Sequence, residues 1–162
     1  MTTDLAALEA YLHTHIPLSR AMEVAVVQAD AEGVRLRAPL GPNINHRDTI
    51  FGGSASALAI LAGWTLIHTR LRDNAHPSRI VIQRNTIEYS RPLPGDFEAF
   101  CPAPAPESWE RFLRSLRRRG RARIQVHAEL YGEGEVAGSF EGAYVAFGER
   151  AARAGIPDPG TV

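Results

Sequence analysis

The stretch NINHRDTIFGGSASALAILAGW, residues 43–64, changes from polar to apolar at two adjacent glycines, Gly52 and Gly53. From Ser54 to about Arg72 the chain has helical character, and its first four turns carry small or apolar residues on nearly every side. Such a pattern is typical of a buried helix, because a surface helix keeps one polar face. The sequence therefore predicts a long enclosed helix with a polar loop directly before it.

The segments around this helix read mainly as strands. Apolar residues alternate with polar ones through residues 20–40 on either side of a turn at Gly33, and again in residues 78–92, 96–104, 124–130 and 136–147. Helical spacing predicts a short helix that ends before Pro17 and a second at residues 106–119, which Gly120 can terminate. An α+β fold is expected, with an antiparallel sheet curled around the long helix. One small sheet covers such a helix incompletely, so we also expect self-association, with edge-to-edge pairing of sheets as one route.

Composition narrows the class of protein. The 162 residues fit one domain, expected at residues 1–150, followed by a loosely held tail at 151–162. The formal net charge is zero, which favours neither nucleic acid nor a membrane surface as a partner. All eighteen basic residues are arginine, so an anion site here must use guanidinium groups or backbone N–H groups.

Location and metal chemistry follow from the same counts. A single cysteine, Cys101, excludes an intrachain disulfide. The N-terminal residues lack the features of a secretory signal, and the longest apolar run is too short to span a bilayer. We expect a cytoplasmic protein. The six histidines do not form a metal-ligand pattern, so no metal site is expected.

The polar loop places potential catalytic side chains at the start of the buried helix. The first N–H groups of a helix have no intrahelical acceptor, and Gly52 and Gly53 would let a ligand carbonyl approach them. Such an arrangement can stabilise the oxyanion formed in acyl transfer. Asp48 is the local carboxylate, Asn45 can position water or substrate, and His46 can act as a base. The alternative is structural: the glycines form a tight turn, Asp48 caps backbone N–H groups and Ser54 is an N-cap.

A family resemblance rests on the same residues. The pattern formed by Asn43, Asn45, Thr49, Phe51, Gly52, Gly53, Ser54, Leu58, Ala59, Leu61, Ala62, Gly63 and Trp64 resembles the YiiD C-terminal-domain family of thioesterases. The segment IVIQRNTIEYSRPLPGDFEAFC, residues 80–101, is also similar to that family, and the likeness extends over about residues 10–148. The resemblance implies the hotdog fold, in which an antiparallel sheet wraps a long helix. It also implies dimers through paired sheets, with active sites at the subunit interface.

This sequence has only some of the site residues that are usual in hotdog thioesterases. Related hotdog thioesterases carry Asn or Asp, then Gly, then His-Gly-Gly, with an acid further along the helix. Asn45, Gly52 and Gly53 match, whereas Asp48 stands at the glycine, Phe51 at the histidine and Ile60 near the acid. Two of the usual polar groups are therefore missing, and Asp48 is the replacement carboxylate that the loop offers.

Further residues complete the predicted site. Gln83 and Asn85 are expected to share a strand face with Val81, Ile87 and Tyr89 and to line a pocket, although pairing with backbone or solvent is the alternative. Arginines near residue 120 can meet the phosphates of coenzyme A, and a solvated helix face explains some of them equally well. The substrate-binding candidates are His46, Thr49, Phe51, Ser54, Ser56, Gln83, Asn85, Arg118, Arg119 and Arg121, and the catalytic candidates are Asp48, Asn45, Gly52 and Gly53.

The expected function is hydrolysis of an acyl thioester, carried by coenzyme A or by a carrier protein. Coenzyme A enters as part of the substrate, and no separate cofactor is expected. We expect a homodimer or a dimer of dimers. Two other classes remain open: a non-catalytic acyl-CoA-binding hotdog protein, and a hydratase or dehydratase that would depend on His46.

Overall fold

A computed structural model describes residues 3–76 and 78–148. In this part of the chain the helices are α1 (Leu5–His15), α2 (Pro17–Ala21), α3 (Gly52–Asp73) and α4 (Pro106–Arg119), with a 3-10 turn at Gly41–Asn43. The strands are β1 (Ala25–Ala29), β2 (Gly33–Ala38), β3 (Ser78–Tyr89), β4 (Phe97–Pro102), β5 (Arg121–Gly132) and β6 (Glu135–Gly148). The order of elements is the predicted one, with α2 added.

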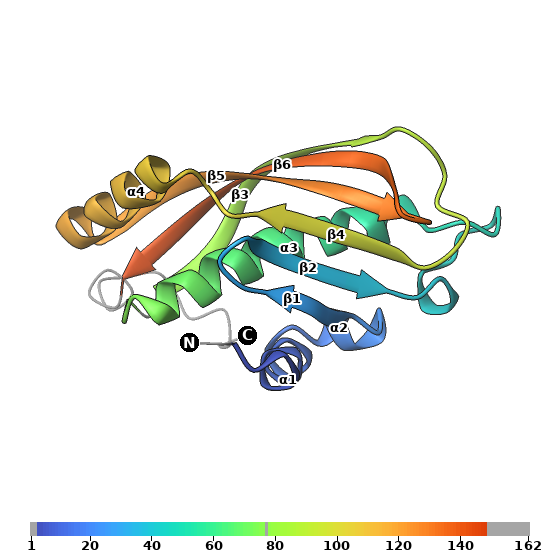
Figure 1. The fold of residues 1–162 in the computed structure, drawn as a ribbon, viewed down its shortest axis with the longest axis horizontal. Coiled ribbons are helices and arrows are strands. Elements are labelled where there is room, and N and C mark those ends of the chain that lie inside the picture. The colour runs from blue at the N-terminus through green and yellow to red at the C-terminus, as the bar shows by residue number, and fades with distance from the viewer. Residues whose placement is uncertain (1–2, 77, 149–162) are drawn as a thin grey trace, which may run out of the picture.

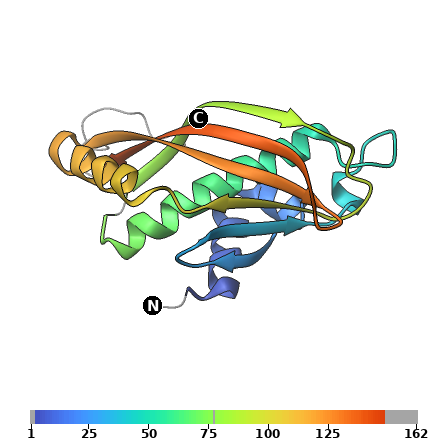
Figure 2. The same ribbon diagram turned by 45° about the horizontal axis from the view of Figure 1, so that its top comes forward.

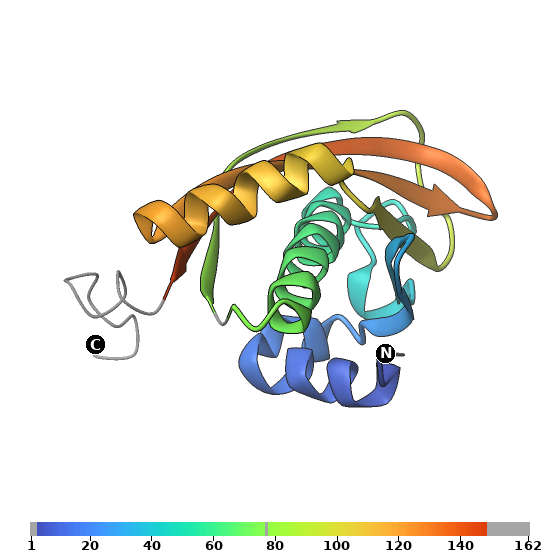
Figure 3. The same cartoon turned by 60° about the vertical axis from the view of Figure 1, so that its left-hand side comes forward.

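The six strands form one antiparallel sheet that curves around α3 (Figures 1 and 3). Their order across the sheet is β1-β2-β4-β5-β6-β3. Strand β5 alternates regularly between buried and exposed residues, so one face of the sheet turns inward to α3 and the other faces outward. Half of the residues of α3 are buried (11 of 22). The small and apolar residues on nearly every side of this helix predicted its burial.

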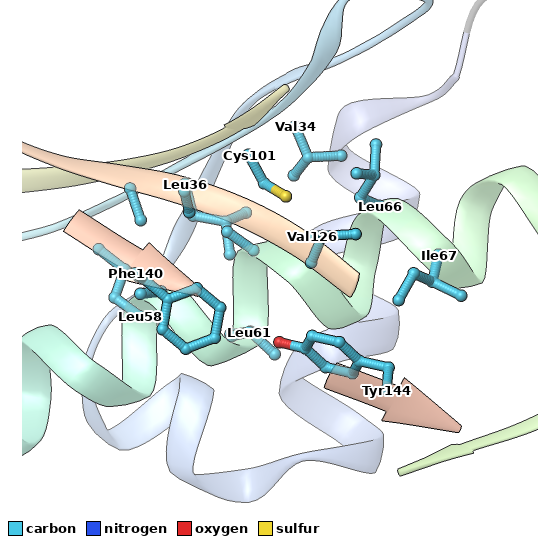
Figure 4. Close-up of a cluster of buried hydrophobic side chains, with 14 of the residues drawn as sticks. Val34, Leu36, Leu58, Leu61, Leu66, Ile67, Cys101, Val126, Phe140 and Tyr144 are labelled. Atoms are coloured by element: carbon cyan, nitrogen blue, oxygen red, sulfur yellow. The ribbon is translucent and has the colours of Figure 1, made fainter. Parts of the chain in front are cut away.

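The sheet packs tightly against α3 at Gly63. The Tyr144 side chain of β6 is fully buried in the core (Figure 4). Its hydroxyl donates a hydrogen bond of 2.6 Å to the carbonyl of Ile60. A Cβ at Gly63 would lie only 2.6 Å from that hydroxyl oxygen. The absence of a side chain at Gly63 therefore lets the ring pack against the helix. Burial raises the pKa of the Tyr144 phenol, which stays protonated at neutral pH.

The α4 helix covers the part of β5 that β4 does not reach. Strand β4 pairs only with residues 129–132 of β5, and α4 contacts β5 and β6 (Figure 2). Its buried stripe is the predicted one, Trp109, Phe112, Leu113 and Leu116. Gly120 ends the helix with φ of 69°, a left-handed conformation that glycine adopts without strain.

The two edges of the sheet differ. At β1, side chains from α1 contact two backbone groups: Glu9 accepts a hydrogen bond of 2.9 Å from the Val26 N–H, and His13 Nε2 lies 2.8 Å from the carbonyl oxygen of Val24, just before the strand. The other edge is β3, twelve residues long, with Val81 and Tyr89 about half exposed. Because α1 blocks β1, β3 is the edge that remains open to pairing.

The predicted helix end before Pro17 is confirmed, since α1 ends at His15, and Pro17 begins the additional helix α2. One sequence prediction is wrong in this region. Gln83 and Asn85 do not share a face, because a bulge between Ile82 and Arg84 interrupts the alternation of β3. Asn85 lies opposite Gly142 on the inner face, whereas Val81 lies opposite Val145 on the outer face.

The structure also bears on the predictions about Cys101, membrane helices and metal sites. Cys101 is fully buried and desolvation raises the pKa of its thiol to about 12, so this thiol is not a nucleophile. None of the described helices is long and apolar enough to cross a membrane. Residues 3–76 and 78–148 hold no cluster of three metal-binding side chains. The predicted tail, 151–162, lies outside the described residues.

Candidate active site

The start of α3 presents free backbone donors. Phe51 is the N-cap residue and provides no side-chain cap. The first N–H of this region with an acceptor in the helix is that of Ala55, which donates to the Phe51 carbonyl. Among the described residues, no acceptor serves the N–H groups of Gly52, Gly53 and Ser54. Three donors at the positive end of a 22-residue helix can stabilise a developing negative charge.

Two exposed aromatic side chains flank these donors. The Tyr89 hydroxyl, at the end of β3, donates a hydrogen bond of 2.7 Å to the Gly52 carbonyl. Tyr89 and Phe51 are 52% and 57% exposed, which is high for aromatic side chains and leaves both able to contact a ligand. Phe51 was predicted at the site and Tyr89 was assigned only to a pocket-lining strand. Nothing in the sequence places Tyr89 beside Gly52, because the contact spans 37 residues.

Asn45 builds the loop before the helix. Its amide nitrogen donates to Thr49 Oγ1 at 3.0 Å and to the Ile50 carbonyl at 3.2 Å. Its amide oxygen accepts from the N–H groups of Arg47 at 2.8 Å and Thr49 at 3.3 Å. An asparagine side chain has two donor hydrogens and two acceptor lone pairs. The predicted role of Asn45 in directing water or substrate is therefore not supported, and Thr49 likewise serves the loop.

Asp48 occupies a left-handed position in the same loop, with φ of 60°. Glycine, asparagine and aspartate tolerate this conformation best, which accounts for Asp48 at a position where related folds often have glycine. The side chain is exposed and forms no ion pair within residues 3–76 and 78–148. His46 is also exposed, and its Nε2 lies 3.3 Å from Arg47 Nε. Asp48 is thus a free carboxylate on the segment between β2 and α3, which extends from one end of the protomer (Figures 1 and 2).

An apolar strip continues from the helix start along α3 and β3. Ala57, Ile60 and Trp64 of α3 are half-buried, as are Ile82 and Ile87 of β3. Ser54 and Ser56, both predicted to bind substrate, are also partly exposed near the beginning of α3. These side chains pack against the core but are not fully covered in a single protomer. They form a surface that an acyl chain or a second subunit can cover.

The predicted arginines separate into two groups. Arg119 and Arg121 line a hollow of about 650 Å³ at the junction of α4 and β5, whereas Arg118 is exposed and not part of its lining. Gln83 also lines this hollow, while Asn85 belongs to a neighbouring one. This hollow lies toward the end of α3 that is opposite to Gly52 and Gly53 (Figure 1). The structure therefore does not bring all predicted site residues of one protomer together.

Most of the chain matches a known protein family. A model of the family described as "Putative thioesterase (yiiD_Cterm)" matches residues 5–148. The chain belongs to this family. A solved structure described as "the putative thioesterase from Shewanella oneidensis" is 27% identical to this chain, with a TM-score of 0.79, over 88% of this chain and 96% of that chain.

Two other solved structures share the fold of this chain. A protein of unknown function from Chlorobaculum tepidum is 28% identical, with a TM-score of 0.83, over 88% of this chain and 93% of that one. A "Probable Thioesterase" from Pseudomonas aeruginosa is 23% identical with a TM-score of 0.79, covering 92% and 99%, and this likeness shows the fold alone. The hotdog fold predicted from the sequence is confirmed, and a thioesterase-like function is supported.

Proposed function

We propose that this chain hydrolyses acyl thioesters, with acyl-CoA as the substrate, at the start of α3. The observation that carries the proposal is the set of three acceptor-free N–H groups at Gly52, Gly53 and Ser54, in a chain of a thioesterase family. These donors lie at the positive end of the helix dipole. The thioester carbonyl oxygen would accept hydrogen bonds from them and would gain negative charge as the tetrahedral intermediate forms.

The remaining chemistry needs water and a base. Water attacks the carbonyl carbon and gives a proton to the base; the carbon–sulfur bond then breaks, and the leaving thiolate takes up that proton from the base. Asp48 is the carboxylate proposed to accept that proton, since it has no ion-pair partner in the described chain. The mechanism requires no cofactor beyond the coenzyme A of the substrate.

The acyl chain is proposed to lie along the apolar strip beside α3. Ala57, Ile60 and Trp64 would form one wall, and Ile82 and Ile87 the other. Each is only half-buried in the protomer, so an acyl chain laid there would remove apolar surface from water. Phe51 and Tyr89 would flank its carboxyl end, next to the donors.

A dimer through β3 is proposed to complete this strip. Strand β3 is the open edge of the sheet, whereas Glu9 and His13 of α1 contact backbone groups of Val26 and Val24 at the β1 edge. Two copies of β3 related by a two-fold axis would pair antiparallel into one continuous sheet. The apolar residues on the inner face of β3 would then be covered from both subunits.

The mass in solution tests this dimer. We expect the purified full chain to sediment at about 35 kDa, twice the 17.7 kDa of one chain, or at a multiple of that dimer mass. Pairing through β3 would also slow hydrogen exchange at the backbone amides of β3 that face away from β6. A monomer of 17.7 kDa at micromolar concentration would contradict the proposed assembly.

Replacement of Asp48 by asparagine tests the proposed base. Asparagine tolerates the left-handed φ of 60° at this position, so Asp48→Asn removes the charge and keeps the turn. We expect kcat for acyl-CoA to fall by roughly 100-fold or more, the usual contribution of a general base, with unchanged melting temperature. Release of free thiol from acyl-CoA is the measurement, and a variant with full activity would remove Asp48 from the mechanism.

One rival function has a specific observation in its favour. Asn45 has no free hydrogen-bonding group, and the position of the usual helix acid holds Ile60, so polar catalytic groups are few. A protein that binds acyl-CoA without hydrolysis would need none of them. Thermal stabilisation by acyl-CoA without release of free thiol would select this binding function over the hydrolase.

A further inference from the structure

We propose that Tyr89 is a positioning residue for the reaction. Its hydroxyl holds the peptide group between Gly52 and Gly53, so that the Gly53 N–H keeps one direction toward the thioester oxygen. This inference rests on the proposed thioesterase function and adds to it a residue that acts through the backbone of the helix start. Tyr89 itself neither donates to the oxyanion nor exchanges a proton with the substrate.

The Gly52–Gly53 peptide group carries one of the proposed oxyanion donors. Among the described residues, no acceptor serves the Gly53 N–H. On the other side of the same peptide group, the Gly52 carbonyl accepts the hydrogen bond of 2.7 Å from the Tyr89 hydroxyl. A peptide group is planar and trans, so its C=O and N–H bonds point in opposite directions. A contact that fixes the Gly52 carbonyl oxygen therefore also fixes the direction of the Gly53 N–H.

The chain itself restrains this peptide group only weakly. Both of its residues lack a Cβ atom, and glycine has access to more backbone conformations than any other residue. The group also lies in the first turn of α3, where the N–H groups have no intrahelical acceptor. Helix ends open more readily than helix middles, because they have fewer bonds to break. A hydrogen bond from outside the helix therefore adds a restraint that the two glycines lack.

Phe51 excludes a side chain at Gly53 as the source of this restraint. A Cβ at Gly53 would overlap the ring of Phe51, which lies against this glycine. A Cβ at Gly52, by contrast, would lie 3.4 Å from the Tyr89 hydroxyl and the carbon that bears it. The two aromatic rings thus contact one glycine each. Glycine is required at position 53, and the restraint comes from Tyr89 at position 52.

Tyr89 can hold the helix start because its own backbone is fixed. It pairs with β6 at the end of β3, and the next residue, Ser90, donates a hydrogen bond of 2.9 Å to the Ala137 carbonyl. The following segment holds the loop before α3, since the Ile50 N–H donates to the Leu93 carbonyl at 2.8 Å. The end of β3 therefore lies beside the start of α3 (Figure 2). A side chain on a paired strand positions its partner more precisely than one on a free loop.

Tyr89→Phe removes the hydroxyl and keeps the ring. We expect kcat for acyl-CoA hydrolysis to fall roughly three- to tenfold, as the loss of one hydrogen bond implies. KM should not change, because the restrained donor acts in the transition state. The melting temperature should also stay the same, since the Tyr89 side chain is 52% exposed. Full activity of Tyr89→Phe, or a higher KM with unchanged kcat, would overturn the proposed role.

Tyr131→Phe is the matched control. The Tyr131 hydroxyl donates to Glu129, and its ring lies against Arg35 on the outer face of the sheet. This variant removes the same atom from a hydrogen-bonded tyrosine that does not contact the helix start. We expect wild-type kcat and KM. A loss of kcat equal to that of Tyr89→Phe would show that the effect is not specific to the Gly52 carbonyl.

Rescue by Gly52→Ala tests whether the hydroxyl acts by restraint. Alanine keeps the N–H of residue 52 and limits its backbone conformations, so it supplies part of the restraint that Tyr89→Phe removes. We expect Gly52→Ala to raise kcat of the Tyr89→Phe variant at least twofold, although it has little effect in the wild-type background. A hydroxyl that bound the substrate directly could not be replaced in this way. A double variant with no gain over Tyr89→Phe would therefore contradict the inference.

The mobility of the Gly53 N–H separates this inference from the proposed function. In the full chain without substrate, we expect an NMR order parameter of about 0.85 for this N–H in the wild type and in Tyr131→Phe, and a value falling toward about 0.6 in Tyr89→Phe. Such a decrease would support the restraint even in a chain that releases no thiol. An equally rigid Gly53 N–H in Tyr89→Phe would overturn it even in a chain that hydrolyses acyl-CoA.

Discussion

Gly52→Pro is expected to lower kcat for acyl-CoA hydrolysis by roughly 100-fold to 1,000-fold, the cost of removing one oxyanion donor. Gly52 is the first residue of α3, where proline fits because its missing N–H has no helical partner. Phe51 before it has φ of −61° and ψ of 131°, the conformation that a residue preceding proline prefers. The substitution thus removes a single donor and preserves the helix.

Gly52→Ala is the matched control. Alanine keeps the N–H, and its Cβ would lie 3.4 Å from the Tyr89 ring, a contact that the ring can accommodate by a small shift. We expect nearly full activity from Gly52→Ala and an unchanged melting temperature for both variants. Equal activity of the proline and alanine variants would show that the Gly52 N–H does not stabilise the transition state.

The second large effect concerns stability at Gly63. In an open helix position, Gly→Ala stabilises by about 1 kcal/mol. At Gly63 the added Cβ would lie 2.6 Å from the Tyr144 hydroxyl oxygen and 3.0 Å from the carbon that bears it. Because Tyr144 is fully buried and bonded to Ile60, the ring has little room to move. We expect Gly63→Ala to lower the free energy of unfolding by about 1–3 kcal/mol, the usual cost of overpacking.

A double-mutant cycle with Tyr144→Phe identifies the cause. Phenylalanine lacks the hydroxyl that lies nearest the new Cβ, so Gly63→Ala should cost less in the Tyr144→Phe background. The free energies come from chemical denaturation of the four variants. A cost at Gly63 that is the same in both backgrounds would exclude the contact with the hydroxyl as the source of strain.

Local patterns in the sequence predicted most of the fold. The apolar character of residues 54–72 predicted a buried helix, and α3 spans Gly52–Asp73. The stripe in residues 106–119, bounded by Pro106 and Gly120, predicted α4 with its observed bounds. The bulge after Ile82 escaped prediction, because it depends on pairing with β6 and leaves no mark in the composition of β3.

The candidate site was predictable only in part. Gly52 and Gly53 lie where the motif placed them, because the start of a helix is a local property. The hydrogen-bonding groups of the Asn45 side chain are all used within the loop, because this side chain closes a turn with Thr49 and Ile50. Sequence spacing does not reveal such a turn. The same holds for the arginine-lined hollow, which needs α4, β5 and β6 to be brought together.

The central claim is that the start of α3 catalyses hydrolysis of acyl thioesters. The most direct test is the rate of free-thiol release by the purified wild-type chain, measured over acyl-CoA substrates of increasing chain length. Cys101 adds no background, because its thiol is fully buried and its pKa is raised to about 12. We expect saturable turnover with at least one acyl group. Stabilisation by acyl-CoA with no thiol release at any chain length would contradict the claim.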